Sequence, residues 1–225
     1  LDYYTSEWKK LGFQPDGIYT GFLSSEKQVD KILDFINSFE TENTLVLVDP
    51  VMGDGGRTYS LFTDALACKM KKLVTVADVI TPNLTECCIL CDVDYCKFIK
   101  NADKPDFMDK IAELGKNLLN RYGVKIVIIT GIEHKDIDGT MYVQNLIASK
   151  DEVFSVSCKK IGGSYSGTGD LFASVMFSGL LRGDTLRDTV SLAVKFIETS
   201  LRDTVALGID RNEGIEFEKH LKILL

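Results

Sequence analysis

Apolar residues along the chain form short continuous runs that alternate with longer periodic stretches. The runs have the length of strands and cover residues 17–22, 44–48, 76–81, 124–130, 140–144 and 153–157. Two of them, Thr44-Leu-Val-Leu-Val48 and Lys125-Ile-Val-Ile-Ile-Thr130, contain too few polar positions for one face to meet water. These runs predict strands that are covered on both faces, as in a parallel sheet between two layers of helices.

The stretches between the runs repeat their apolar residues at the 3.6-residue period of a helix. Helices are expected around Tyr3 to Leu11, after Ser25, and over residues 61–73, 107–122 and 185–201. Ser25 and Gln28 have the spacing of a capping box, and Gly123 stands where a helix-ending glycine is expected. Residues 1–225 are therefore predicted to form one α/β domain, a three-layer sandwich with a mostly parallel sheet. The runs at 140–144 and 153–157 predict a hairpin at an antiparallel edge of that sheet.

Composition excludes several kinds of partner. The formal net charge of −7 argues against nucleic acid, because binding to phosphate backbones depends on clustered Lys and Arg. No apolar run approaches the roughly 20 residues needed to span a bilayer, and the chain opens Leu-Asp-Tyr-Tyr-Thr rather than with a basic and then apolar leader. We expect a soluble, cytoplasmic protein with no membrane partner.

Four of the six cysteines lie close together, at positions 87, 88, 91 and 96. Cys88-x-x-Cys91 has the spacing of zinc ligands, but there is no second Cys-x-x-Cys and the nearest histidine is His134. Free thiols that pack as small apolar groups on a helix are the preferred interpretation.

A glycine-rich turn that opens an apolar helix is the strongest chemical signal: Gly162-Gly-Ser-Tyr-Ser-Gly-Thr-Gly-Asp170. Unpaired N–H groups and the helix dipole make such a turn suitable for an anion, and Asp170 can alternatively serve only as a dipole complement. Thr168 occupies the position of the P-loop lysine, and Phe172 that of the third glycine in a dinucleotide fingerprint. No serine here has the spacing of a nucleophile elbow, so these three motif classes are excluded.

Two further segments end a predicted strand in polar residues. Residues 48–59 run from a buried strand through Asp49 into a glycine loop, and residues 77–86 run into a helix start at Asn83 with Glu86 three positions later. Ligands of open α/β sheets bind at the carboxyl ends of strands, where Asp49 and Glu86 could meet a hard cation such as Mg²⁺. Taken singly, an ordinary Asp-Pro turn is the less favoured alternative for the first segment, whereas a capping box alone is the preferred explanation of the second.

Together, Asp49-Pro-Val-Met-Gly-Asp, Thr81-Pro-Asn-x-x-Glu86 and Gly167-Thr-Gly-Asp170 resemble the pyridoxal kinase branch of the ribokinase superfamily. The likeness extends through the whole chain, from Thr20-Gly-Phe-Leu-Ser to Ile129-Thr-Gly. It implies a ribokinase-like fold and a kinase that phosphorylates the 5′-hydroxymethyl group of pyridoxal, pyridoxamine or pyridoxine with Mg-ATP. A monovalent cation such as K⁺ and a homodimer are also in keeping with the resemblance.

The resemblance implies a role for each matching residue. Asp170 matches the base that takes the proton from the substrate hydroxyl as it attacks the γ-phosphate. Gly167, Thr168 and Gly169 match an anion hole for the transferring phosphoryl group. Asp49 and Glu86 match acidic residues near Mg-ATP, and Asn83 belongs to the same motif as Glu86. Thr130 matches a nucleotide-contacting position. Tyr59 matches part of a lid over the phosphates.

One departure and two alternatives follow from the same residues. Family members usually begin with a strand and flap that contact the pyridine ring, whereas this chain opens with a predicted helix, so we expect the first strand to be lacking. Hydroxymethylpyrimidine or its phosphate is the rival substrate, because it too is a flat ring with a hydroxymethyl group; a sugar is less favoured. A vitamer-binding protein without turnover is the alternative of another class, and retention of Asp170 argues against it.

Overall fold

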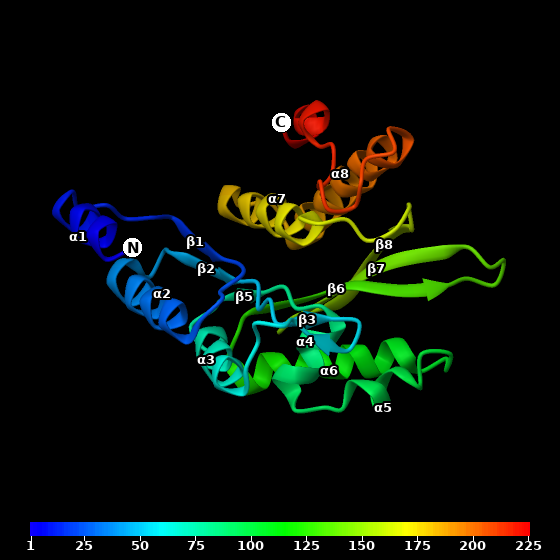
Figure 1. The fold of residues 1–225 in the computed structure, drawn as a ribbon, viewed down its shortest axis with the longest axis horizontal. Helices are drawn as coiled ribbons and strands as arrows, with labels where there is room; N and C mark the ends of the chain where they lie inside the picture. The colour runs from blue at the N-terminus through cyan, green and yellow to red at the C-terminus, as the bar shows by residue number, and fades with distance from the viewer. The chain divides into compact units, whose positions relative to one another are not determined.

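The structure is a computed structural model that describes residues 1–225. Its main helices are α1 (Asp2–Lys10), α2 (Glu26–Phe39), α3 (Asp64–Val74), α4 (Leu84–Cys91), α5 (Tyr95–Ile99), α6 (Phe107–Tyr122), α7 (Thr168–Arg182), α8 (Leu186–Ala206) and the 3₁₀ helix η1 (Glu218–Leu224). Its strands are β1 (Gly17–Thr20), β2 (Leu45–Val48), β3 (Gly53–Asp54), β4 (Arg57–Thr58), β5 (Val79–Ile80), β6 (Ile126–Lys135), β7 (Met141–Ser149) and β8 (Val153–Lys159). Figure 1 follows them along the chain.

Six strands form one sheet in the order β1-β2-β5-β6-β7-β8, and β3 and β4 form a separate hairpin. The first four strands of the order are parallel, with Thr20 opposite Val48, Val48 opposite Ile80, and Ile80 opposite Val127. Residues 46–48 and 127–129 are buried completely, as expected for strands covered on both faces. The predicted α/β class with a mostly parallel sheet is confirmed.

The end of the sheet is antiparallel. Ser149 N–H donates to Glu152 O at 2.9 Å, and Lys160 N–H donates to Met141 O at 2.9 Å, so β7 and β8 pair as a hairpin. The predicted hairpin is therefore confirmed, but β7 continues to Ser149, beyond the predicted end at residue 144. Residues 145–148 are buried, which explains why they extend the strand rather than form a polar loop.

Local capping accounts for several helix ends. The helix predicted over residues 107–122 has those bounds, and Gly123 closes it with φ of 73°. Ser25 caps α2 by accepting Gln28 N–H, but Gln28 Oε1 accepts Ser24 N–H at 2.7 Å, so the predicted reciprocal box is shifted by one residue. Helix α3 begins at Asp64 rather than at residue 61, because Thr63 caps it.

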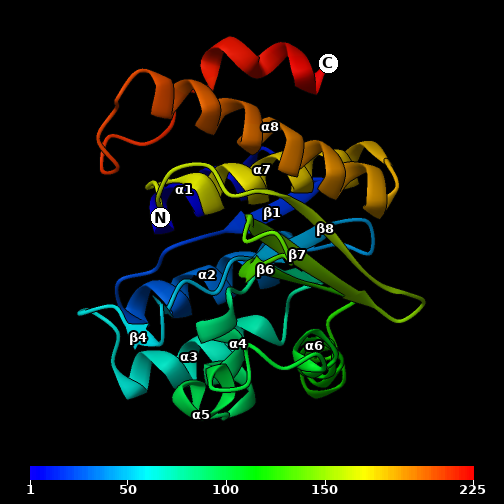
Figure 2. The same cartoon turned by 90° about the vertical axis from the view of Figure 1, so that its right-hand side faces the viewer.

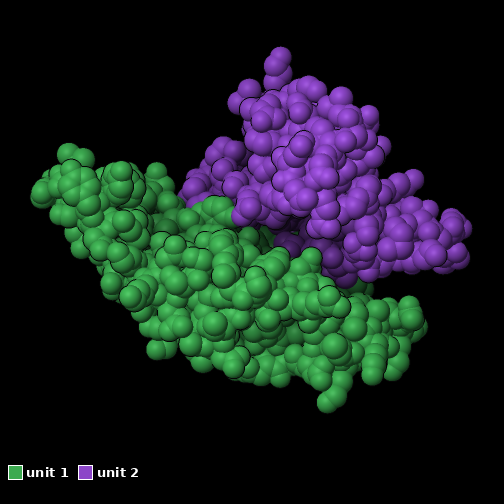
Figure 3. Space-filling model, in the orientation of Figure 1, with its two compact units in different colours: residues 1–129, 147–153 green, residues 130–146, 154–225 purple.

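The chain divides into two compact units, coloured separately in Figure 3. Unit 1 comprises residues 1–129 and 147–153, and unit 2 comprises residues 130–146 and 154–225. The prediction of a single domain remains a prediction. None of the helices combines the length and the apolar composition needed to span a lipid bilayer.

Each unit has its own helical packing. In unit 1, α2, α3, α4 and α6 lie on one face of strands β1, β2 and β5 (Figures 1 and 2). In unit 2, α7 and α8 pack along each other, and Gly179 lies so close to Thr189 that an added Cβ would be 2.7 Å from the Thr189 hydroxyl. Small residues of this kind allow two helix backbones to approach closely.

Candidate active site

The predicted residues of unit 1 gather where strands β1, β2 and β5 end. Because these strands are parallel and in register, Thr20, Asp49 and Thr81 come at the same edge of the sheet. Asp49 N–H donates to Thr20 O at 2.8 Å. Thr20 and Thr81 are only 5% and 4% exposed, and their buried hydroxyls lack a hydrogen-bond partner. This edge therefore has unsatisfied oxygen atoms, which is the usual mark of a site that takes a ligand, an ion or water.

Glu86 projects from the first turn of α4 into this edge and is 3% exposed. One carboxylate oxygen accepts Met52 N–H at 3.0 Å, and the other accepts Asn83 N–H at 2.8 Å. The Asn83 side chain accepts Glu86 N–H in return, which completes the predicted capping box. Burial, and then the negative charge of Asp49, raise the pKa of Glu86 to about 8.

The segment after Asp49 is a hairpin rather than the flexible glycine loop expected from the sequence. Strands β3 and β4 pair through Gly53 and Thr58 around a turn in which Gly55 and Gly56 have φ of 56° and 78°. Gly55 N–H donates to Asp54 Oδ1 at 2.7 Å, and Gly56 N–H donates to Thr85 Oγ1 at 2.9 Å. Both turn amides are thus engaged within the protein, so they are not open to a phosphate in this conformation.

Tyr59 follows the hairpin, as predicted, and is 44% exposed. Its N–H donates to Met52 O at 3.0 Å, so Tyr59 lies at the base of the hairpin, next to the residue that precedes β3. Burial, and then the charges of Glu86, Asp54 and Asp49, raise the pKa of the Tyr59 phenol. Tyr59 is therefore near enough to Asp49 and Glu86 for their charges to affect it.

These residues fit a hard cation. Burial, and then the charge of Asp49, raise the pKa of Glu86, and the Thr81 hydroxyl is a buried oxygen without a hydrogen-bond partner at the same edge. No group of three or more His, Cys, Asp or Glu side chains is placed to enclose a metal ion. Because both Glu86 oxygens already accept amide hydrogens, the set suits Mg²⁺, which keeps much of its water shell and binds few protein oxygens.

The predicted residues of unit 2 lie at the start of α7. Gly167 is the N-cap with φ of 81°, and no side chain caps the helix amides. An added Cβ at Gly169 would meet no atom within 4 Å, so the turn is open on that side. Asp170 lies in the first helical turn and is exposed. The turn therefore offers uncapped amides to an anion next to a carboxylate.

Two contacts hold this turn in place. Thr168 Oγ1 donates to Tyr165 O at 3.0 Å, and Ser166 N–H donates to Arg211 O at 2.9 Å. The second contact ties the turn to the segment that follows α8. Nothing in the sequence indicated the role of Arg211, because a backbone carbonyl is available at every residue.

Thr130, the predicted nucleotide contact, is half-buried on β6 and belongs to unit 2. The next residue, Gly131, has φ of 70°, and its N–H donates to the buried Asn145 side chain at 3.2 Å. Strand β6 continues past this point to Lys135, so Thr130 is followed by a glycine in a left-handed conformation within the strand.

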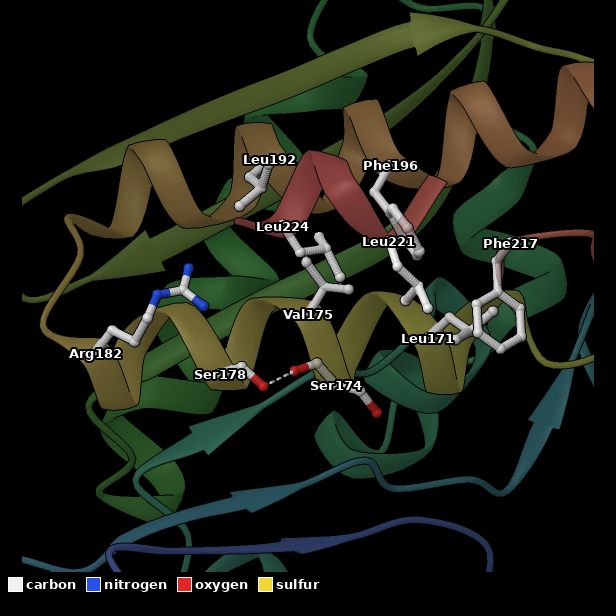
Figure 4. Close-up of a pocket in the computed structure, with 10 residues that line it drawn as sticks. All are labelled: Leu171, Ser174, Val175, Ser178, Arg182, Leu192, Phe196, Phe217, Leu221 and Leu224. Carbon is white, nitrogen blue, oxygen red and sulfur yellow. Dashed lines mark hydrogen bonds between the residues drawn. The ribbon is translucent and has the colours of Figure 1, made fainter. Parts of the chain in front are cut away.

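A small cavity of about 180 Å³ lies between α7, α8 and η1 (Figure 4). Its walls are mostly apolar, with Val175, Leu192 and Phe196 among them. The hydroxyls of Ser174 and Ser178 donate to carbonyls of their own helix at 2.7 and 2.8 Å. Arg182, the one charged lining residue, is paired with Asp184 at 2.6 Å, so the cavity offers a phosphate neither a free cation nor a free hydroxyl donor.

The clustered cysteines are free, and Cys87, Cys88 and Cys91 are buried on α4. Burial raises the pKa of both the Cys88 and the Cys91 thiol to about 11. No group of three or more His, Cys, Asp or Glu side chains that includes them is placed to enclose a metal ion.

Residues 10–214 match the sequence profile of the phosphomethylpyrimidine kinase family. The chain belongs to this family. The match covers most of the chain, including the strand edge of unit 1 and the glycine turn of unit 2. The assignment from the three motifs is therefore confirmed at the level of the family that phosphomethylpyrimidine and pyridoxal kinases share.

The names of similar proteins include both candidate substrates, pyridoxal and hydroxymethylpyrimidine. A candidate phosphomethylpyrimidine kinase from Bacteroides thetaiotaomicron, crystallised with pyridoxal, is 36% identical with a TM-score of 0.87, over 99% of this chain and 75% of that one. A candidate pyridoxal kinase of Schizosaccharomyces pombe is 29% identical over 171 residues, which are 74% of this chain and 47% of that protein. A hydroxymethylpyrimidine/phosphomethylpyrimidine kinase of Staphylococcus aureus is 26% identical over 198 residues, 88% of this chain and 66% of that protein. The chain thus spans about half to two thirds of the length of these two curated relatives.

Proposed function

We propose that the protein transfers the γ-phosphoryl group of Mg-ATP to the 5′-hydroxymethyl group of pyridoxal, pyridoxamine or pyridoxine. The observation that carries this proposal is the close likeness, over 99% of the chain, to a family member that was crystallised with pyridoxal. The three motifs of the sequence support it, because each lies where its unit presents polar groups at a strand end or a helix start.

In the proposed reaction, the Asp170 carboxylate accepts the proton of the substrate hydroxyl, whose oxygen then attacks the γ-phosphorus. The bond from that phosphorus to the β,γ-bridging oxygen breaks, and ADP leaves. The amides of Gly167, Thr168 and Gly169 stabilise the negative charge on the transferring group, which is the main task in phosphoryl transfer. The exposed position of Asp170 and the uncapped start of α7 support these roles.

Asp49 and Glu86 are proposed to hold Mg²⁺, with Glu86 acting through the water shell of the ion. Bound Mg²⁺ would neutralise charge on the nucleotide phosphates. Asn83 keeps Glu86 in place, Tyr59 covers the phosphates and Thr130 contacts the nucleotide. A role for a monovalent cation such as K⁺ and a homodimeric assembly remain predictions.

Hydroxymethylpyrimidine or its phosphate is the second candidate substrate, favoured by the family profile and by the Staphylococcus aureus relative. The reaction would use the same residues, because only the ring that carries the hydroxymethyl group differs. A vitamer-binding protein without turnover is the alternative of another class.

A coupled assay of ATP turnover, with pyridoxal and hydroxymethylpyrimidine in parallel, tests the proposal. Phosphorylated product with pyridoxal and a lower rate with the pyrimidine is the expected result. A higher kcat/KM with the pyrimidine would overturn the substrate assignment. Binding of pyridoxal without product from either compound would favour the binding protein.

A further inference from the structure

The hairpin of residues 53–58 is held by the start of one helix, α4. Three residues at this helix start each bond a different part of the hairpin or its approach. Glu86 accepts Met52 N–H at 3.0 Å, Asn83 Nδ2 donates to Gly53 O at 2.7 Å, and Thr85 Oγ1 accepts Gly56 N–H at 2.9 Å. Two of these residues belong to the sequence motif, whereas Thr85 has no assigned role.

Tyr95, at the start of α5, completes this support. Its ring lies against Gly56, where an added Cβ would be 2.6 Å from Tyr95 Cε1. Only a glycine allows so close an approach of the turn to the ring. Thr85 and Tyr95 therefore contact the same turn residue, Gly56, from two different helices.

The support fixes what the hairpin can offer to a ligand. Since the amides of Gly55 and Gly56 are engaged by Asp54 and Thr85, the turn does not act as an anion hole of its own. Its outgoing strand leads instead into Tyr59, whose N–H is bonded to Met52 O. A shift of the hairpin would thus move Tyr59 relative to Asp49 and Glu86.

We propose that Thr85 and Tyr95 are positioning residues, which hold the hairpin of residues 53–58 on α4 and thereby set the affinity of the unit 1 strand edge for the metal–nucleotide complex. The inference rests on the proposed function only in taking that complex as the ligand. Neither residue touches the reacting atoms in this scheme, so their removal affects binding and not the proton transfer.

Thr85→Val tests the proposal, because it removes the hydroxyl while keeping a branched side chain, and Thr85→Ser restores the hydroxyl. Tyr122→Phe is the matched control. The Tyr122 hydroxyl, on α6 of the same unit, donates to Leu90 O, so this variant also removes one side-chain hydrogen bond. Hydrogen exchange at Gly56, the dissociation constant of Mg-ADP by calorimetry, and kcat would be measured for each. Tyr95→Ala provides a second, independent loss of support.

For Thr85→Val we expect about tenfold faster exchange at Gly56 and about five- to tenfold weaker Mg-ADP binding, in line with the loss of one hydrogen bond. The kcat at saturating substrates should stay within about twofold, since proton transfer is untouched. Thr85→Ser should restore both values, and Tyr122→Phe should change neither.

Unchanged exchange, or faster exchange with unchanged Mg-ADP affinity, would overturn the inference. Wild-type protein that binds no Mg-ADP would overturn it as well. Wild-type protein that binds Mg-ADP but phosphorylates neither test compound would instead sink the proposed function, while the binding measurements still decide the role of Thr85.

Discussion

Glu86 and Met52, 34 residues apart, are joined by a buried hydrogen bond in which Met52 N–H donates to Glu86 Oε1 at 3.0 Å. The bond fastens the segment after β2 to the helix that follows β5. Because the carboxyl group is buried beside Asp49, its protonation state is linked to the stability of the fold.

We predict that this link makes stability fall as the pH rises. The folded protein holds the Glu86 proton up to about pH 8, whereas the unfolded chain releases it near the ordinary pKa of 4.5. Between pH 4.5 and about pH 8 the folded protein binds the extra proton, so the free energy of unfolding falls as the pH rises. The slope of that fall is about 1 kcal/mol per pH unit. Urea unfolding at several pH values should show this slope in the wild type. Glu86→Gln, which mimics the neutral acid, should flatten it, and an equal slope in the variant would refute the assignment.

The same substitution should raise the Mg²⁺ concentration needed for activity. The introduced side-chain amide would keep a carbonyl oxygen for one backbone N–H but cannot ionise, whereas bound Mg²⁺ would favour release of the Glu86 proton and so gain a charged partner. Titration of turnover with Mg²⁺ would measure the effect, with about a tenfold increase expected from the loss of one charged partner. Glu113→Gln on α6 is a control outside the motif. An unchanged requirement would leave Glu86 with its capping role alone.

Asn83 has two separable tasks, which a pair of variants can distinguish. Its Oδ1 caps α4, and its Nδ2 donates to Gly53 O at 2.7 Å. Asn83→Ser keeps a capping oxygen but removes the amide donor without adding a charge, so we expect a loss of about 1 kcal/mol in the free energy of unfolding. Asn83→Ala removes both bonds and should lose about 2 kcal/mol. Equal losses in urea unfolding would show that the cap adds nothing beyond the bond to Gly53.

The regular part of the fold was accessible from the sequence because its signals are local. Helix α6 was predicted with its observed bounds, since an apolar stripe and a terminal glycine specify both the helix and its end. The hairpin β3–β4 was missed because strands of two residues carry no period, although the Asp-Gly-Gly turn was visible. The end of β7 was placed too early because burial of residues 145–148 depends on the rest of the fold.

Some residues of the candidate site could likewise be predicted from the sequence, and others could not. Asp49 and Glu86 could be paired from the rule that parallel strands end at one edge, and the pKa of Glu86 is raised by burial and then by the charge of Asp49. The unsatisfied hydroxyls of Thr20 and Thr81 could not be inferred, because they follow from strand register and burial. Thr85 and Tyr95 were also missed, since their contact with Gly56 arises only after the hairpin has folded onto α4.

Gly179 and Thr189 provide a test of the packing in unit 2. In an ordinary helix interior, Gly→Ala stabilises by about 1 kcal/mol. Here the new Cβ would lie 2.7 Å from Thr189 Oγ1, so we expect Gly179→Ala to destabilise by about 1–3 kcal/mol instead. The double variant Gly179→Ala with Thr189→Ala should recover most of that loss in urea unfolding. A stabilised single variant would show that α7 and α8 can move apart at no cost.

Asp170 can be a catalytic base or only a complement to the dipole of α7, and the two roles predict different results. A base contributes about 10²-fold or more to the rate, so Asp170→Asn should lower kcat by that factor with little change in the affinity for ATP. A dipole complement would change the free energy of unfolding by less than about 1 kcal/mol and leave kcat unchanged. Asp188→Asn is the matched control, because Asp188 occupies the first turn of α8 in the same unit. If Asp170→Asn and Asp188→Asn had equal turnover, Asp170 would be removed from the proposed proton transfer.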